Sequence, residues 1–137
     1  MKKRIIAGCF CGWIVLALTG CTVGEEEKVR KVRDLEYTVV KEREIPQDLV
    51  EVIETKKAEK FKVTYTDNEY LYISYGYGQQ ATGGYSISVK DLYESDNAIY
   101  FSVEVHGPKR GEEVSQGNSY PYIVVKTEAL DLPVVFE

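Results

Sequence analysis

Hydrophobic and polar residues alternate along most of the chain after residue 34, and this alternation predicts β-strands. Alternation with a period of two places every second side chain on the same face of a strand. Strands are expected over residues 35–41, 60–66, 69–75, 85–92, 98–105, 120–126 and 133–136. Short strands that are separated by turns and connected as hairpins are typical of an antiparallel sheet.

One segment has helical rather than alternating spacing. Within residues 45–57, one helical face is apolar and comprises Ile45, Leu49, Val52 and Ile53. Pro46 lies in the first turn, where proline is tolerated. This apolar face is expected to pack against the sheet. We therefore expect an α+β fold that is mainly β: an antiparallel sheet, as a sandwich or a small partly open barrel, with one packed helix.

The first twenty residues have the architecture of a signal peptide. Lys2, Lys3 and Arg4 precede an apolar run over residues 5–18, and small residues come just before Cys21. The apolar run is too short, and wrongly flanked, for a permanent membrane-spanning helix. The alternatives are an uncleaved anchor helix and an ordinary secretory signal.

The ending Leu18-Thr-Gly-Cys21 resembles the lipobox of bacterial lipoproteins. The resemblance implies that residues 1–20 are removed and that acyl chains on Cys21 anchor the protein on the extracytoplasmic side of the membrane. Each buried CH₂ of such a chain contributes about 0.8 kcal/mol. Cys9 and Cys11 would leave with the leader, so the mature domain would hold no free thiol and no disulfide.

Charge and length limit what the mature protein is expected to do. Residues 21–33 comprise Cys21 and a short tether of mixed charge, and residues 34–137 are expected to form a single domain. Loss of the three basic residues of the leader takes the formal net charge from −5 to −8. An acidic chain of this kind does not bind nucleic acid through a general basic face.

The stretch over residues 76–86 holds four of the eleven glycines and lies between two predicted strands. Glycine permits positive φ and close approach of other groups, so special backbone geometry is expected here. A strand follows the glycines, and the first lysine after them is Lys90, which excludes a phosphate-binding loop. The alternative is a hairpin loop that binds nothing.

Several elements, taken in order, resemble the C-terminal domain of the protease complex subunit PrcB-like family. They cover about residues 60–136: residues 78–87, the strand through Phe101, residues 108–111, residues 120–125 and the closing Pro133-Val134. The family pattern often has proline where Ala81 stands. The resemblance implies an accessory role in the assembly or stability of a surface protease, although the domain also occurs in proteins with no known partner.

Candidate catalytic and metal-binding groups are few. His106 is the only histidine and precedes Gly107-Pro108 at a strand end, which favours a structural or solvated role over a place in a catalytic triad. Asp91, Glu94 and Asp96 do not have the spacing of an EF-hand calcium loop. We therefore expect a protein that is not an enzyme and that has neither a metal site nor a cofactor.

Two binding hypotheses follow. The first is a protein–protein interaction module with a partner in the cell envelope, because tyrosine supplies rigid amphipathic contact area. Its expected contact residues are Tyr75, Tyr77, Gly78, Thr82, Gly83, Gly84, Tyr85, Pro108 and Tyr120. The alternative is a cell-wall or carbohydrate-binding module that stacks sugars on a solvent-side row of Tyr70, Tyr72 and Tyr100. Cross-strand packing is the competing role for those three rings.

Removal of the leader has a spectroscopic consequence. Trp13 is the single tryptophan of the chain and lies within the apolar run. The mature protein, purified from membranes, is therefore expected to show tyrosine emission alone. Tryptophan emission from the purified protein would show that the leader is retained.

Overall fold

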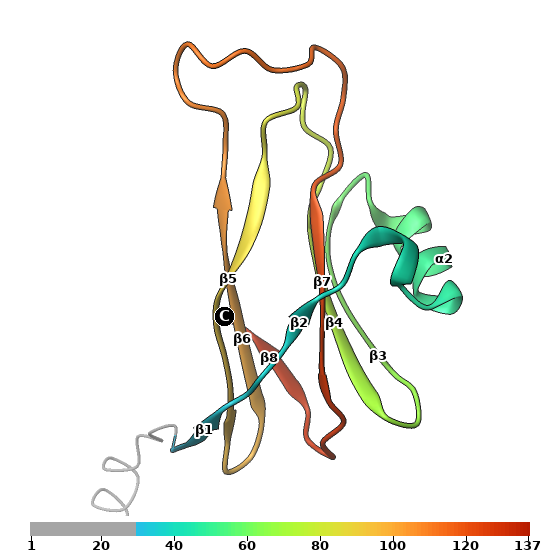
Figure 1. Ribbon diagram of the computed structural model, residues 1–137, viewed down its shortest axis with the longest axis vertical. Helices are drawn as coiled ribbons and strands as arrows, with labels where there is room; N and C mark the ends of the chain where they lie inside the picture. The colour runs from blue at the N-terminus through green and yellow to red at the C-terminus, as the bar shows by residue number, and fades with distance from the viewer. Residues whose placement is uncertain (1–29) are drawn as a thin grey trace, which may run out of the picture.

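The computed structural model describes residues 30–137, which form two four-stranded sheets packed face to face, with one helix against the outer face of the second sheet (Figure 1). The strand order is β1-β5-β6-β8 in the first sheet and β2-β7-β4-β3 in the second. The elements are β1 (Lys31–Asp34), β2 (Thr38–Val39), the 3₁₀ helix η1 (Glu42–Glu44), α2 (Gln47–Lys56), β3 (Lys60–Thr66), β4 (Tyr70–Tyr77), β5 (Ser86–Ser95), β6 (Ile99–His106), β7 (Tyr122–Glu128) and β8 (Val134–Phe136). The predicted α+β, mainly β fold is confirmed, in its sandwich form.

Hairpin-like antiparallel pairing connects most neighbouring strands, as the alternation predicts. The exception is β8, which pairs in parallel with Ile99–Phe101 at the start of β6. A bulge in β5 falls between Val89 and Asp91 and adds one residue to that strand. The bulge keeps Ile87, Val89 and Leu92 all on the inner face, although their spacing is uneven.

The core between the sheets contains the apolar residues of the alternating strands. Ile73, Ile99, Phe101 and Val125 are each at most 1% exposed, and Leu71, Leu92 and Ile123 complete the layer. Full burial of one such side chain stabilises the fold by about 1.5–3 kcal/mol. This is the layer that the strand pattern predicts.

A second core lies between the outer face of the second sheet and α2. Leu49 and Ile53 of the helix pack there against Phe61 of β3 and Val124 of β7. The helical face predicted to be apolar is therefore confirmed as a packing face. The helix begins at Gln47, two residues later than predicted, because Ile45 caps the preceding 3₁₀ turn in an extended conformation.

The N-terminal part of the domain differs from the expectation. Residues 31–33, predicted as tether, belong to β1, which pairs with the end of β5 while its own side chains stay exposed. Of the predicted inner row Leu35, Tyr37 and Val39, only Leu35 is buried, because the chain crosses from the first sheet to the second here. The signal peptide, Cys21 and residues 22–29 lie outside the described residues. Among residues 30–137 no helix is long and apolar enough to cross a membrane.

Gly76, the first residue of the glycine-rich stretch, is a buried β4 residue rather than part of a loop. Its cross-strand partner is Phe61, and a Cβ atom added at Gly76 would overlap the Phe61 ring. Glycine is therefore needed here so that the ring can lie flat beneath α2.

Replacement of this glycine provides a test of the second core. Gly76→Ala is expected to lower the free energy of unfolding by about 1–3 kcal/mol, the usual cost of overpacking. Gly117→Ala is the control, because a Cβ there meets no atom within 4 Å. Urea denaturation of both variants measures the difference, and equal stability would contradict the assigned packing.

Candidate interaction site at the loop end

Two loops meet at one end of the sandwich, at the top of Figure 1. One joins β4 to β5 over residues 78–85, and the other joins β6 to β7 over residues 107–121. Gln80 and Ser119 exchange two backbone hydrogen bonds of 2.8 and 2.9 Å, and the Gly83 N–H donates to the Ser115 carbonyl at 3.0 Å. The Ser119 hydroxyl donates to the Thr82 carbonyl at 2.7 Å. We call this joined pair the loop end.

Glycines allow the two loops to approach so closely. Gly84 has a φ of 92°, and a Cβ there would lie 2.5 Å from Cγ1 of Val114 and 3.1 Å from Cβ of Pro108. A Cβ on Gly83 would lie 2.6 Å from the hydroxyl oxygen of Ser115. The special backbone geometry predicted for this stretch is confirmed at both positions.

The tyrosines of the loop end pack against the loops and are half-buried. The Tyr77 and Tyr85 ring centres lie 6.2 Å apart, and the Lys60 ammonium lies 5.0 Å from the Tyr77 ring centre. The Tyr120 hydroxyl donates to Oε1 of Gln79 at 3.3 Å. These contacts hold the rings in place, so they present fixed edges at the surface.

The structure brings together eight of the nine predicted contact residues. Seven side chains or glycines form the loop end itself or its base: Tyr77, Gly78, Thr82, Gly83, Gly84, Tyr85 and Pro108. Tyr120 lies at its edge, where Lys57 approaches the ring to 5.2 Å. Tyr75 lies apart from them, because its side chain faces the space between the sheets.

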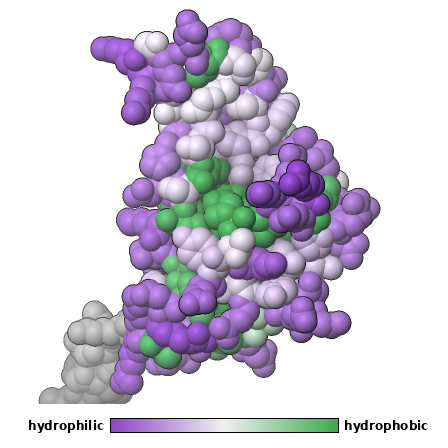
Figure 2. Space-filling model, viewed as in Figure 1, coloured by the Kyte–Doolittle hydropathy of each residue, from purple (hydrophilic) through white to green (hydrophobic). Residues whose placement is uncertain are grey.

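The sequence-based prediction does not include a groove that lies beside the loop end. Figure 2 shows hydrophobic residues gathered in the middle of this face. The groove, of about 380 Å³, is lined by Val39, Val40, Glu42, Ile45, Ile87, Tyr120, Pro121, Tyr122, Ile123 and Val124. Burial, and then the Glu42 and Glu54 carboxylates, raise the pKa of Tyr122. The groove is open because β1 and β2 are too short to cover the edges of β5 and β7 here. This depends on pairing between distant parts of the chain, so no local signal in the sequence could have revealed the groove.

The predicted solvent-side row of Tyr70, Tyr72 and Tyr100 is wrong. Tyr72 is 7% exposed and belongs to the core beneath α2. Tyr100 lies on the other sheet and stacks on Tyr93 with ring centres 5.2 Å apart. Tyr70 is exposed alone, with the Lys126 ammonium 4.5 Å from its ring centre. Because Tyr72 is buried and Tyr100 lies on the other sheet, the three rings cannot form one sugar-stacking platform.

His106 is exposed on the outer face of the first sheet. Its Nε2 lies 3.1 Å from the Ser88 hydroxyl and 4.0 Å from Oε1 of Glu104. A triad needs the acid at Nδ1, opposite the nitrogen that faces the nucleophile, whereas both groups here face the same nitrogen. Across residues 30–137 no group of three His, Cys, Asp or Glu side chains is placed to hold a metal ion.

Comparison with known proteins identifies the part of the chain that contains the loop end. Residues 71–128 match the family model described as PrcB C-terminal. Neither the curated proteins nor the solved structures include a match to the chain. The matching segment runs from β4 to the end of β7, so it includes both loops of the loop end and the four strands β4, β5, β6 and β7. Over this segment, the chain is similar to the PrcB C-terminal family.

Proposed function

We propose that this chain is a bacterial lipoprotein, anchored by acyl chains on Cys21 to the extracytoplasmic side of the envelope, and that it acts without catalysis. In this proposal the loop end binds a protein partner and thereby stabilises or regulates an envelope protease complex. The family is named after a protease complex subunit, which supports a partner of that kind. The His106 geometry described above supports a binding role rather than a catalytic one.

The direction in which the chain enters the domain supports this proposal more than any other single observation. β1 pairs with the end of β5 that lies farthest from the loop end, with Lys31 opposite Ser95. Figure 1 shows β1 and the loop end at opposite ends of the sandwich. The segment between Cys21 and Lys31 can span at most about 36 Å. A lipid on Cys21 would therefore hold the domain near the membrane with the loop end directed away from it.

Preorganisation supports the choice of the loop end as the contact surface. The hydrogen bonds between the loops and the packed rings of Tyr77 and Tyr85 fix the surface before any partner arrives. A surface that is already ordered loses little conformational entropy on binding. Tyrosine edges and the adjoining groove, which mixes apolar and polar groups, supply contact area of the kind found at protein interfaces.

A glycine substitution tests the contact surface. Gly84→Val forces a β-branched residue to a φ of 92° and pushes against Val114 and Pro108. The loops should separate locally, and binding to the envelope partner should weaken at least about tenfold, which corresponds to 1.4 kcal/mol. The full chain is used as bait in a detergent extract of its own envelope, and bound proteins are identified by mass spectrometry.

Gly117→Val is the matched control, because Gly117 lies in the same loop region with no atom within 4 Å of its Cβ position. The control is expected to retain the partner, and circular dichroism is expected to show the sheet intact in both variants. Equal capture by both variants would contradict the assignment of the loop end as the contact surface.

Lipidation has its own test. Cys21→Ser is expected to abolish incorporation of labelled palmitate and to move the protein from the membrane fraction to the soluble fraction after cell disruption, because the acyl chains would provide the anchor. Immunoblots of both fractions measure the change. Palmitate labelling that persists in the variant would contradict Cys21 as the acylated residue.

A further inference from the structure

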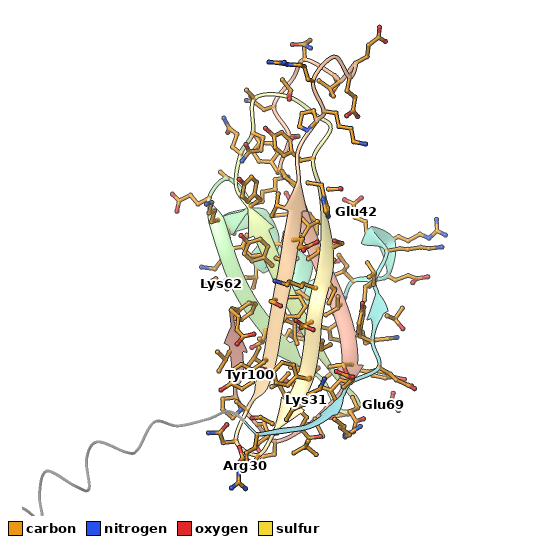
Figure 3. The ribbon with its side chains drawn as sticks, turned by 90° about the vertical axis from the view of Figure 1, so that its left-hand side faces the viewer. Arg30, Lys31, Glu42, Lys62, Glu69 and Tyr100 are labelled. Atoms are coloured by element: carbon orange, nitrogen blue, oxygen red, sulfur yellow. The ribbon has the colours of Figure 1, made fainter. Side chains whose placement is uncertain are left out.

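A second opening lies between the sheets, across the sandwich from the groove. This cleft has a volume of about 160 Å³ and is lined by Lys62, Tyr75, Phe101, Val103, Val105 and Phe136, with Glu137 at its rim. Figure 3 shows Lys62 and Glu42 on opposite sides of the molecule, and Glu42 belongs to the groove. The cleft is therefore separate from the surface assigned to the proposed function.

The short strand β8 leaves an unpaired backbone edge beside this cleft. β8 pairs only with Ile99–Phe101, in the lower half of the sandwich as drawn in Figure 1. The Glu137 N–H donates to the Phe101 carbonyl at 2.9 Å, so the backbone groups of Phe101 point toward β8. Backbone groups of alternate strand residues point the same way, which directs those of Val103 and Val105 to the same edge. No strand of the described chain pairs with this edge beyond Phe101.

The side chains beside this edge are apolar and incompletely covered. Val103, Val105 and Tyr75 are half-buried. Ile99 and Phe101, which precede Val103 and Val105 on the same face of β6, are at most 1% exposed. β8 covers the lower residues of β6 and leaves the upper ones open. An added strand in line with β8 would pair the backbone of Val103 and Val105 and cover their side chains at once.

Positive charge borders the cleft on the side of β3. Lys60 and Lys62 are cross-strand partners of Tyr77 and Tyr75 and therefore share the inner face with them. The Lys62 ammonium lies 5.8 Å from the Phe136 ring centre. Neither lysine is in an ion pair within residues 30–137, although the whole chain carries a net charge of −5. Glu137 at the rim does not lie within 4.0 Å of either ammonium.

We propose that the edge at Val103 and Val105 accepts an extended segment of a partner protein as an additional strand in line with β8. Alternate apolar side chains of this segment enter the cleft over Tyr75, and a carboxylate of the segment pairs with Lys62. The free backbone edge selects an extended peptide, and the unpaired lysines select an acidic one. This inference rests on the proposed function only in that the domain acts by binding protein.

The probe is a capped seven-residue peptide that alternates valine with serine and ends in one glutamate. It is added to the full chain labelled with ¹⁵N-valine in detergent. The amide signals of Val103 and Val105 are expected to shift, and their hydrogen exchange is expected to slow at least about tenfold. A copy of the peptide N-methylated at alternate residues should not bind, because it cannot pair with the edge.

Lys62→Glu should weaken peptide binding about tenfold, because an attractive pair becomes a repulsive one. Lys90→Glu is the matched control, since Lys90 is an exposed strand lysine outside the cleft. Equal binding of the methylated copy, equal effects of the two variants, or shifts confined to the groove or loop end would each overturn the inference. Failure of the peptide to bind, while the envelope extract still yields a partner lost in Gly84→Val, would overturn the strand site and leave the proposed function standing.

Discussion

The second sheet is covered on both faces, and the rest of the structure depends on that arrangement. In β4, Leu71 and Ile73 face the first sheet, while Tyr72 faces α2. In a strand that is buried on both faces, a polar side chain without a hydrogen-bond partner would destabilise the fold. The buried Ser74 hydroxyl has such a partner, because it donates to the Val63 carbonyl at 3.2 Å. Without α2, the side chains beneath it would be exposed and the outer face of the sheet would lose its core.

The lengths of the edge strands decide where the sandwich is closed and where it is open. β1, β2 and β8 are four, two and three residues long and pair away from the loop end. Near the loop end, β5, β6 and β7 are longer than these partners, so the space between the sheets opens on two sides. The groove and the cleft are thus two consequences of one feature of the topology.

The loop end and the point of chain entry lie at opposite ends of the sandwich. At the loop end, Gly83 and Gly84 let the two loops approach closely enough to form hydrogen bonds with each other. In the proposed lipoprotein, this preorganised surface would lie at the end of the domain farther from the anchor. Its affinity for a partner would then depend on contact quality rather than on folding of the loops.

The sequence by itself determined the strands from β3 to β8, the helix and the candidate lipidated residue, because alternation, helical spacing and the lipobox are local patterns. It also indicated the loop end, since glycines at positive φ are recognisable from composition. Only the tertiary structure decided that Tyr72 is buried, that Gly76 makes room for Phe61, and that Tyr75 faces a cleft. Alternation separates the two faces of a strand, but it does not tell which layer covers each face. That choice depends on pairing between residues far apart in the chain, such as β6 with β8 and β4 with β7.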